Sequence, residues 1–221
     1  MYLSRIALNV ELRATMRALA SPQILHGAVE GAFPRAPAGA RSRKLWRLDM
    51  LNGRYYLLVL SAQQPDFSRL AAQFGCPDAN RPWETKSYNP LLARLAAGQI
   101  WRFRLRANPV RSSFRDRKDT SGRSQVHAHV TQDQQKQWLL KRAQPHGFLL
   151  AEDAFDIVHT EWKRFRKSDG SGRLVTLRTA AFEGILTISD CERFRQALLC
   201  GIGRAKAYGC GLLTVAPLGE G

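Results

Sequence analysis

The pattern of apolar and polar residues changes its period near residue 11. Residues 2–10 are mostly apolar and predict a strand, whereas residues 11–33 carry apolar positions at helical spacing. Pro22 interrupts this helical pattern, and proline is tolerated in the first turn of a helix but not in its interior. We therefore predict a helical region that is interrupted at Pro22, with Ser21 as an N-cap and Pro22 at the first helical position after it.

Two strand-like segments follow and are separated by Asn52-Gly53. An Asn-Gly pair between such segments is a strong signal for a tight β-hairpin. A helical stretch around residues 66–74 and an extended segment near residues 83–88 complete the first half. The predicted order is strand, helix, strand, strand, helix, strand, which is the ferredoxin-like order βαββαβ.

The second half of the chain repeats this order. Its last helix starts near Ser189, where Ser189 and Glu192 have the spacing of a capping box. The predicted elements are, in order, a strand over residues 99–110, a charged loop, a helix over 131–143, two strands flanking a turn at 168–172, a helix ending before Gly201 and a strand over 210–218.

The fold class predicted from this repeated order is α+β, with two tandem ferredoxin-like (RRM-like) domains. We place the N-terminal domain at residues 1–88 and the C-terminal domain at residues 99–221. Residues 89–98 contain a proline and a glycine and are assigned as the linker, although LLARLAA at residues 91–97 could form one or two helical turns.

Charge is the least ordinary property of the composition. The 221 residues include 34 Lys and Arg against 18 Asp and Glu, which gives a formal net charge of +16 and a sequence pI near 10.6. Such an excess attracts polyanions, and nucleic acid is the polyanion that a basic protein most often binds. Arg dominates the excess, and its planar side chain suits contact with phosphate through two hydrogen bonds.

Other classes of protein find no support in the sequence. The cysteines include no CxxC pair, so neither a zinc site nor a disulfide framework is indicated. No stretch reaches the roughly 18 apolar residues of a membrane span, and the first residues lack the apolar core of a signal peptide. We therefore expect a cytoplasmic protein without a metal or another cofactor. The four cysteines are Cys76, Cys191, Cys200 and Cys210.

A glycine-rich segment, GIGRAKAYGCG, lies between the last predicted helix and the last strand. Glycines at this density let backbone amides approach a ligand or another strand, and Arg204 and Lys206 can meet phosphate. The segment is not a dinucleotide-binding fingerprint, because Lys206 stands where that motif has its third glycine. A structural turn and a phosphate-binding loop both fit this pattern. Its glycines are Gly201, Gly203, Gly209 and Gly211.

Four ordered segments give the chain a more specific resemblance. MYLSRI, FRLRANPV, FEGILTI and the closing GIGRAKAYGCGLLTVAPL resemble the CasE family, the RNA-processing endonucleases of type I-E CRISPR systems within the RAMP superfamily. The resemblance runs from residue 2 to residue 218. It implies two ferredoxin-like domains and metal-independent cleavage of precursor CRISPR RNA at the base of the repeat hairpin. It also implies 5′-hydroxyl and 2′,3′-cyclic phosphate ends.

The same resemblance implies the partners of the protein. They are the CRISPR repeat RNA hairpin, which would be retained after cleavage, and the other subunits of the Cascade complex. No membrane partner is expected. The free protein is expected to be a monomer.

His26 is the candidate catalytic residue that the resemblance indicates. The family carries its catalytic histidine in a context resembling LHxxxxxxFP, which is matched here from Leu25 to Pro34. Independently, His26 lies beside the apolar stripe of its predicted helix, on the same side as Gln23, and is expected to be accessible. A histidine can take the proton from the attacking 2′-hydroxyl or give one to the leaving 5′-oxygen. The stripe consists of Ile24, Leu25, Ala28, Val29 and Phe33.

Gln23 departs from the family pattern. Many relatives carry a tyrosine three residues before this histidine, one helical turn away on the same face. Glutamine forms hydrogen bonds but has no ionisable proton. Gln23 is therefore a candidate site residue that would orient His26 or the phosphate, and cleavage is expected to be slow if the tyrosine of relatives shares in proton transfer.

Basic and aromatic residues alternate in a candidate RNA-binding hairpin at residues 162–173, which the resemblance implies reads the base of the RNA stem. Because A-form RNA hides its major groove from side chains, we expect contacts mainly with phosphates and the stem end. The loop over residues 112–125 is a second, weaker candidate. The predicted RNA-binding residues are Lys163, Arg164, Arg166, Lys167, Arg173, Arg204, Lys206, Arg111 and Arg115.

The remaining histidines carry weaker signals. His127 and His129 form an HxH pair, a spacing found in some metal sites, but no third ligand is evident. We expect both to be solvated or to face RNA. His146 and His159 belong to no recognisable constellation.

Two other functions fit part of the pattern. One is a RAMP-fold subunit that binds RNA without cutting it, with Gln23 as a sign of lost activity. The other is a basic packaging or ribosome-associated protein, which would carry basic tails or low-complexity segments that this sequence lacks.

Overall fold

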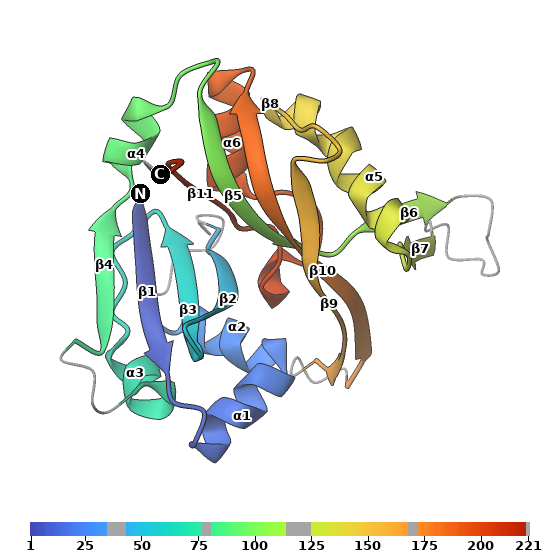
Figure 1. Ribbon diagram of the computed structural model, residues 1–221. Coiled ribbons are helices and arrows are strands. Elements are labelled where there is room, and N and C mark those ends of the chain that lie inside the picture. The colour runs from blue at the N-terminus through green and yellow to red at the C-terminus, as the bar shows by residue number, and fades with distance from the viewer. Residues whose placement is uncertain (35–42, 77–80, 114–124, 168–171, 220–221) are drawn as a thin grey trace.

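The computed structural model describes residues 1–34, 43–76, 81–113, 125–167 and 172–219 of the chain (Figure 1). These residues form two ferredoxin-like domains, each with an antiparallel sheet covered by helices. The predicted α+β class and the tandem arrangement are confirmed. Most of the predicted charged loop and of the turn at residues 168–172 lies outside the described residues.

The N-terminal domain has the strand order β2-β3-β1-β4, which is the order of a ferredoxin-like sheet. Its helices pack on one sheet face, around Ile6, Leu57 and Val59. The strands are β1 (Tyr2–Leu8), β2 (Leu45–Leu51), β3 (Arg54–Ser61) and β4 (Trp83–Ser87). The helices are α1 (Arg13–Ala20), α2 (Pro22–Glu30) and α3 (Ser68–Phe74).

The hairpin predicted at Asn52-Gly53 connects β2 to β3. Asn52 and Gly53 have φ angles of 49° and 75°. Two positive φ values in a two-residue loop are the requirement of a type I′ turn, whose twist matches that of the flanking strands.

The break at Pro22 is also confirmed, since α1 ends at Ala20 and α2 begins at Pro22. Ser21 occupies the N-cap position, although its side chain forms no capping hydrogen bond among the described residues. The apolar stripe of α2 is narrower than predicted. Leu25 and Val29 are fully buried, whereas Ile24 is 38% exposed. Ile24 directly precedes Leu25 in the helix and therefore lies at the edge of the buried face.

The C-terminal domain repeats the topology, with the strand path β11-β5-β10 and with β9 paired to β10. A short strand, β8, pairs with the far end of β10. The strands are β5 (Ile100–Ala107), β8 (Phe148–Leu149), β9 (Phe155–Arg166), β10 (Leu174–Ile188) and β11 (Leu213–Ala216). The helices are α5 (Gln132–Ala143) and α6 (Cys191–Cys200), together with the 3₁₀ helix η1 (Gln144–His146).

Two short elements lie in the predicted linker and the predicted charged loop. The linker at residues 89–98 contains a helix, α4 (Asn89–Arg94), which overlaps the segment LLARLAA, where the sequence allows one or two helical turns. The segment predicted as a charged loop is bounded by a two-stranded hairpin, β6 (Val110–Ser113) and β7 (Gln125–Ala128). These two strands are too short to be identified from the sequence by their periodicity.

The start of α6 differs from the prediction by one residue. Asp190, not Ser189, is the N-cap, and its carboxylate accepts a hydrogen bond from the backbone N–H of Arg193 at 3.0 Å. Glu192 therefore lies one position too early for the predicted capping box. Asp and Ser cap helices about equally well, so the sequence alone could not choose between these neighbours.

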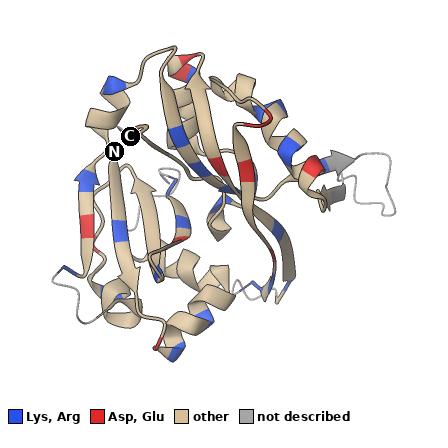
Figure 2. Cartoon of the chain, viewed as in Figure 1, with Lys and Arg blue, Asp and Glu red and all other residues tan. Residues whose placement is uncertain are grey.

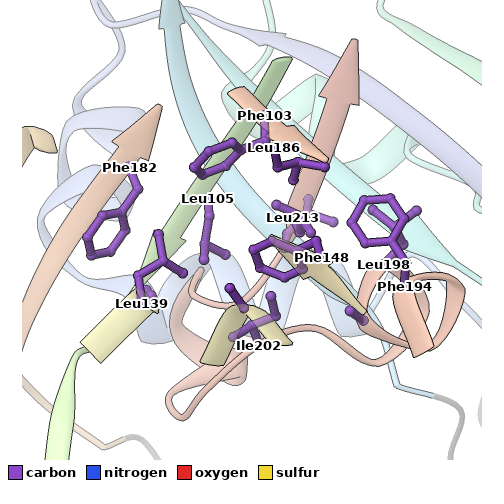
Figure 3. Packing of buried hydrophobic residues seen from close by; sticks show 14 of the residues in the cluster. Phe103, Leu105, Leu139, Phe148, Phe182, Leu186, Phe194, Leu198, Ile202 and Leu213 are labelled. Carbon is purple, nitrogen blue, oxygen red and sulfur yellow. The ribbon is translucent and has the colours of Figure 1, made fainter. Parts of the chain in front are cut away.

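The main core joins the C-terminal sheet to α5 and α6 (Figure 3). Trp138 of α5 stacks on Phe182 of β10, with ring centroids 6.3 Å apart. The cluster also includes Leu45 and Leu60 from the N-terminal sheet, so one apolar core extends across both domains. Within the described residues, no helix is long and apolar enough to cross a membrane.

A buried arginine fixes the two domains to each other. Arg47 of β2 is 2% exposed, and its guanidinium forms a bidentate ion pair with Asp49 at 2.7 and 2.8 Å. The same side chain donates to the backbone oxygens of Arg104 and Leu212, at 2.8 and 2.9 Å, and to the hydroxyl of Thr214 at 2.8 Å. All five donors of the guanidinium are thereby used, which is the condition for burying such a charge.

Candidate active site and RNA interface

A cleft of about 1340 Å³ lies between α2 and the glycine-rich loop. It forms where the two domains meet, because α2 belongs to the N-terminal domain and the loop precedes β11 of the C-terminal domain. The loop contains a 3₁₀ helix, η2 (Lys206–Tyr208), which packs against α2 and β2. The charged and imidazole side chains that line the cleft are His26, Glu30, Arg43, Lys44, Arg69, Arg204 and Lys206.

His26 lies in the wall of this cleft and is half-buried, so its side chain is partly accessible. The flanking Leu25 and Val29 are fully buried and anchor α2 to the sheet. The imidazole makes an edge contact with the ring of Tyr208, with centroids 6.4 Å apart. A partly exposed histidine held beside a wide cleft can reach a proton on a bound substrate.

The cleft is strongly cationic. Glu30 carries the one carboxylate among the described residues that line it, and this carboxylate accepts a hydrogen bond from Lys44 at 2.9 Å. Among the described residues, neither Arg204 nor Lys206 has an acidic partner within ion-pair distance. Burial lowers the pKa of Lys206, and the nearby Arg43 lowers it further. Cations that repel one another around open space attract a bound phosphate.

Arg43, Lys44 and Arg69 were missed by reasoning from sequence. Arg43 and Lys44 precede β2 and Arg69 lies in α3, so each is separated in the chain from His26 and from the glycine-rich loop. No motif with a short spacing in the sequence connects these three residues to His26 or to the loop. Lys and Arg are also spread over both domains (Figure 2), so charge alone does not locate the cleft.

The glycine-rich loop has a structural role that its sequence did not specify. Gly209 adopts a φ of 78°, and a Cβ at this position would lie 2.7 Å from the buried ring of Trp46. At Gly203, with a φ of 84°, a Cβ would approach Trp138 to 3.0 Å. The glycines thus let the loop lie close against both domains, while Arg204 and Lys206 line the cleft. Gly201 and Gly211 complete the loop, and the N–H of Ile202 donates to the oxygen of Gly211 at 2.9 Å.

Replacing Gly209 by alanine is therefore expected to destabilise the protein in two ways, through the positive φ and through the contact of the new Cβ with Trp46. Gly98 is the matched control, because its φ is 83° but a Cβ there would meet nothing within 4 Å. We expect Gly209→Ala to lower the free energy of unfolding by about 1 to 3 kcal/mol more than Gly98→Ala, since only the first crowds Trp46. Chemical denaturation of the two variants measures this difference, and equal losses would contradict the packing account.

Gln23 is half-buried on α2 and is not among the residues that line the cleft. The structure therefore does not bring its amide to the side of His26 that faces the cleft. The aromatic ring that does contact His26 comes from Tyr208 of the glycine-rich loop.

The predicted hairpin is formed by β9 and β10, but it does not project all its basic side chains outward. The ammonium of Lys163 donates to the backbone oxygen of Leu19 at 2.8 Å and lies 3.1 Å from the carboxylate of Glu161. Burial lowers the pKa of Lys163, and Arg106 lowers it further. The prediction that Lys163 projects from the hairpin is wrong, because that strand face packs against α1 and α2.

The other basic residues of the hairpin differ in exposure. Arg164 and Arg166 are exposed, and Arg166 donates to the backbone oxygen of Gly172 at 3.0 Å. Lys167 is half-buried and Arg173 is exposed. Residues 168–171, between them in the chain, lie outside the described residues. Arg164 and Arg166 are thus presented to a ligand of this hairpin.

The remaining predicted positions that the structure describes do not line the cleft. Arg111 is exposed on β6, and Arg115 lies outside the described residues. His129 has its pKa lowered by burial and then by Arg111. Among the described residues, no three His, Cys, Asp or Glu side chains gather in a group that could hold a metal ion.

His146 and His159 do not line the cleft either. His146 approaches the backbone oxygen of Arg142 at 2.7 Å through Nδ1. The pKa of His159 is lowered by burial and then by the charge of Arg106. Cys76, Cys191, Cys200 and Cys210 are all within the described residues and are free thiols.

Comparison with known proteins gives one consistent result. A family model described as "CRISPR associated protein" matches residues 1–217. The CRISPR-associated endoribonuclease Cse3 of Thermus thermophilus is 33% identical over 98% of this chain and 100% of that protein. The Cascade subunit CasE of Escherichia coli is 30% identical over 99% of this chain and 100% of that protein. A structure of Thermus thermophilus Cse3 bound to an RNA representing a pre-cleavage complex matches with a TM-score of 0.78 and 30% identity, covering 98% of each chain.

Proposed function

The chain belongs to the family of CRISPR-associated proteins that includes Cse3 and CasE, and from this membership we propose that it is an endoribonuclease. Its substrate is precursor CRISPR RNA, which it cuts at the base of the repeat hairpin. The observation that carries the proposal is the cationic cleft, which brings His26 and the glycine-rich loop together. An anionic RNA strand lying in this cleft passes beside a proton-transferring group.

The reaction follows from these groups. The ribose 2′-oxygen loses its proton and attacks the adjacent phosphorus, while the bond from phosphorus to the 5′-oxygen breaks and that oxygen gains a proton. The products are a 2′,3′-cyclic phosphate and a 5′-hydroxyl. His26 performs one of the two proton transfers, and Arg204 and Lys206 stabilise the charge that develops on the phosphorane. Neither task requires a metal ion or another cofactor.

The RNA stem is assigned to the β9–β10 hairpin. Arg164 and Arg166 are its exposed basic residues and are proposed to contact phosphates at the stem base. Arg111 and Arg115 are proposed to extend this contact along the RNA. With the proposed division into residues 1–88 and 99–221, the first domain supplies His26, and the second supplies the stem-binding hairpin and the glycine-rich loop.

The partners follow from the same proposal. The product RNA stays bound, and the protein acts in the cytoplasm. It is a subunit of a Cascade complex, as the named CasE relative is. The direct test is to incubate the protein with the repeat hairpin of its own genome and to map both the cut and the complex. We expect one cut at the stem base and co-elution of the 3′-terminal hairpin with the protein. Tight binding without a cut would instead identify a non-cleaving RNA-binding subunit.

The salt dependence of RNA binding tests the cationic cleft. Each phosphate contact that is lost lowers the slope of log affinity against log salt by roughly 0.7 to 0.9. We expect the double variant Arg204→Ala with Lys206→Ala to flatten this slope. The matched control removes two exposed charges that do not line the cleft, Lys86 of the edge strand β4 and Arg94 of α4. Filter binding over a range of salt concentrations measures both, and equal slopes would exclude the cleft from the RNA interface.

A further inference from the structure

A line of three aromatic side chains connects the β9–β10 hairpin to His26. Phe165 of β9 is 6% exposed and makes an edge contact with Tyr208, with ring centroids 4.8 Å apart and planes at 67°. Tyr208 makes a second edge contact with His26, at 6.4 Å and 70°. The three rings come from β9, from the glycine-rich loop and from α2, so they join three separate segments of the chain at one point.

Tyr208 is held firmly at the centre of this line. Its backbone N–H donates to the oxygen of Ala205 at 2.9 Å, which closes the turn of η2. Ala205 has a φ of 60°, an unusual value for a residue other than glycine. On the other side, Gly209 is packed against the buried Trp46. The backbone that carries the tyrosine ring is therefore fixed relative to the two domains.

His26, by contrast, has few restraints of its own. Among the described residues, its imidazole has no hydrogen-bond partner, and Tyr208 is its one aromatic contact. A proton-transferring group must lie within about 3.2 Å of the atom it serves, and a misplacement of 1 Å can cost about a hundredfold in rate. A half-buried imidazole that can rotate freely does not meet this demand unless another group limits its rotation.

We infer that Tyr208 is a positioning residue that holds the imidazole of His26 in its cleaving orientation and couples it to the RNA-binding hairpin through Phe165. The inference rests on the proposed endoribonuclease function. The ring is the active part, because both contacts are between rings and the phenol hydroxyl forms no hydrogen bond with a described residue. Edge contacts of this kind stabilise one ring orientation over others.

The test compares Tyr208→Phe, which keeps the ring, with Tyr208→Leu and Tyr208→Met, which remove it. Cleavage of the repeat hairpin is followed under single-turnover conditions with protein in excess. Affinity is measured separately on a substrate with a 2′-deoxy residue before the scissile phosphate. We expect Tyr208→Leu and Tyr208→Met to cleave about 10 to 100 times more slowly than wild type with affinity changed less than about threefold. Tyr208→Phe is expected to stay within about threefold of wild type.

Each result bears on the inference. Wild-type cleavage rates in the Leu and Met variants would overturn it, and so would a Phe variant as slow as these two, since that assigns the effect to the hydroxyl. Thermal unfolding identifies any variant that fails to fold. In that case Phe165→Leu serves as a second variant, because it removes the ring that contacts Tyr208 without altering the loop. We expect Phe165→Leu to slow cleavage at least threefold. An unchanged rate for a folded Phe165→Leu protein would overturn the coupling. A wild-type protein that does not cleave at all would overturn the proposed function itself.

Discussion

The variant His26→Ala is expected to cleave the repeat hairpin about 10² to 10⁴ times more slowly than the wild-type protein, because it lacks the group that transfers a proton. RNA affinity is expected to change less than about threefold, since the cations of the cleft and the exposed arginines of the hairpin are all retained. Single-turnover cleavage and filter binding measure these two quantities. A rate loss without an affinity loss is the mark of a residue that acts on the reacting atoms.

His146→Ala is the matched control for this experiment. His146 is also half-buried, but it follows α5 and does not line the cleft. The variant His146→Ala should therefore cleave the repeat hairpin at the wild-type rate. Unchanged cleavage by His26→Ala would remove His26 from the reaction, and equal losses in both variants would show that the effect belongs to folding rather than to chemistry.

Arg47→Ala is expected to lower the free energy of unfolding by about 3 to 5 kcal/mol. The substitution leaves the carboxylate of Asp49, which is 4% exposed, without its bidentate partner. It also removes the donors that join β2 to β5 and β11. Because α2 and the glycine-rich loop belong to different domains, cleavage activity should fall together with stability.

Arg5→Ala provides the control for this loss. Arg5 forms an ion pair with Glu84 at 3.0 Å, but both side chains are more than two-fifths exposed. An exposed pair contributes about 0 to 1 kcal/mol, so this variant should unfold nearly as wild type does. Urea denaturation of both variants measures the contrast, and a loss for Arg47→Ala no larger than that for Arg5→Ala would contradict the structural role assigned to Arg47.

Arg47 also illustrates what the sequence could not reveal. Along β2, Trp46 and Leu48 alternate with Arg47 and Asp49, a pattern that is typical of a strand with one apolar face and one face in water. In the structure the charged face is covered by the second domain. The alternation correctly indicates a strand, but the surface that covers its charged face comes from residues more than 50 positions away in the chain.

The elements that were predictable are those with a strong local signal. The helix break at Pro22 and the turn at Asn52-Gly53 are confirmed, because proline and a positive φ restrict the backbone whatever surrounds them. The cap of α6 shifted from Ser189 to Asp190, since both residue types suit that position. A local element is therefore predictable from the sequence when its residues allow few backbone conformations.

The candidate site was predictable in part. His26 was identified from a family resemblance, Arg204 and Lys206 were identified from the glycine-rich pattern, and the structure places all three at one cleft. Tyr208 and Arg69 were missed, because neither carries a local signal that separates it from an ordinary packing or surface residue. Only the fold brings their segments to His26.

The central claim is that this protein cuts RNA through the ribose 2′-hydroxyl without a metal ion. The most direct measurement incubates the wild-type protein, in EDTA, with its own repeat hairpin and with the same hairpin carrying one 2′-deoxy residue before the scissile phosphate. We predict complete cleavage of the first RNA to a 2′,3′-cyclic phosphate and a 5′-hydroxyl, and no cleavage of the second. Cleavage of the deoxy substrate, or a reaction that EDTA abolishes, would contradict the claim.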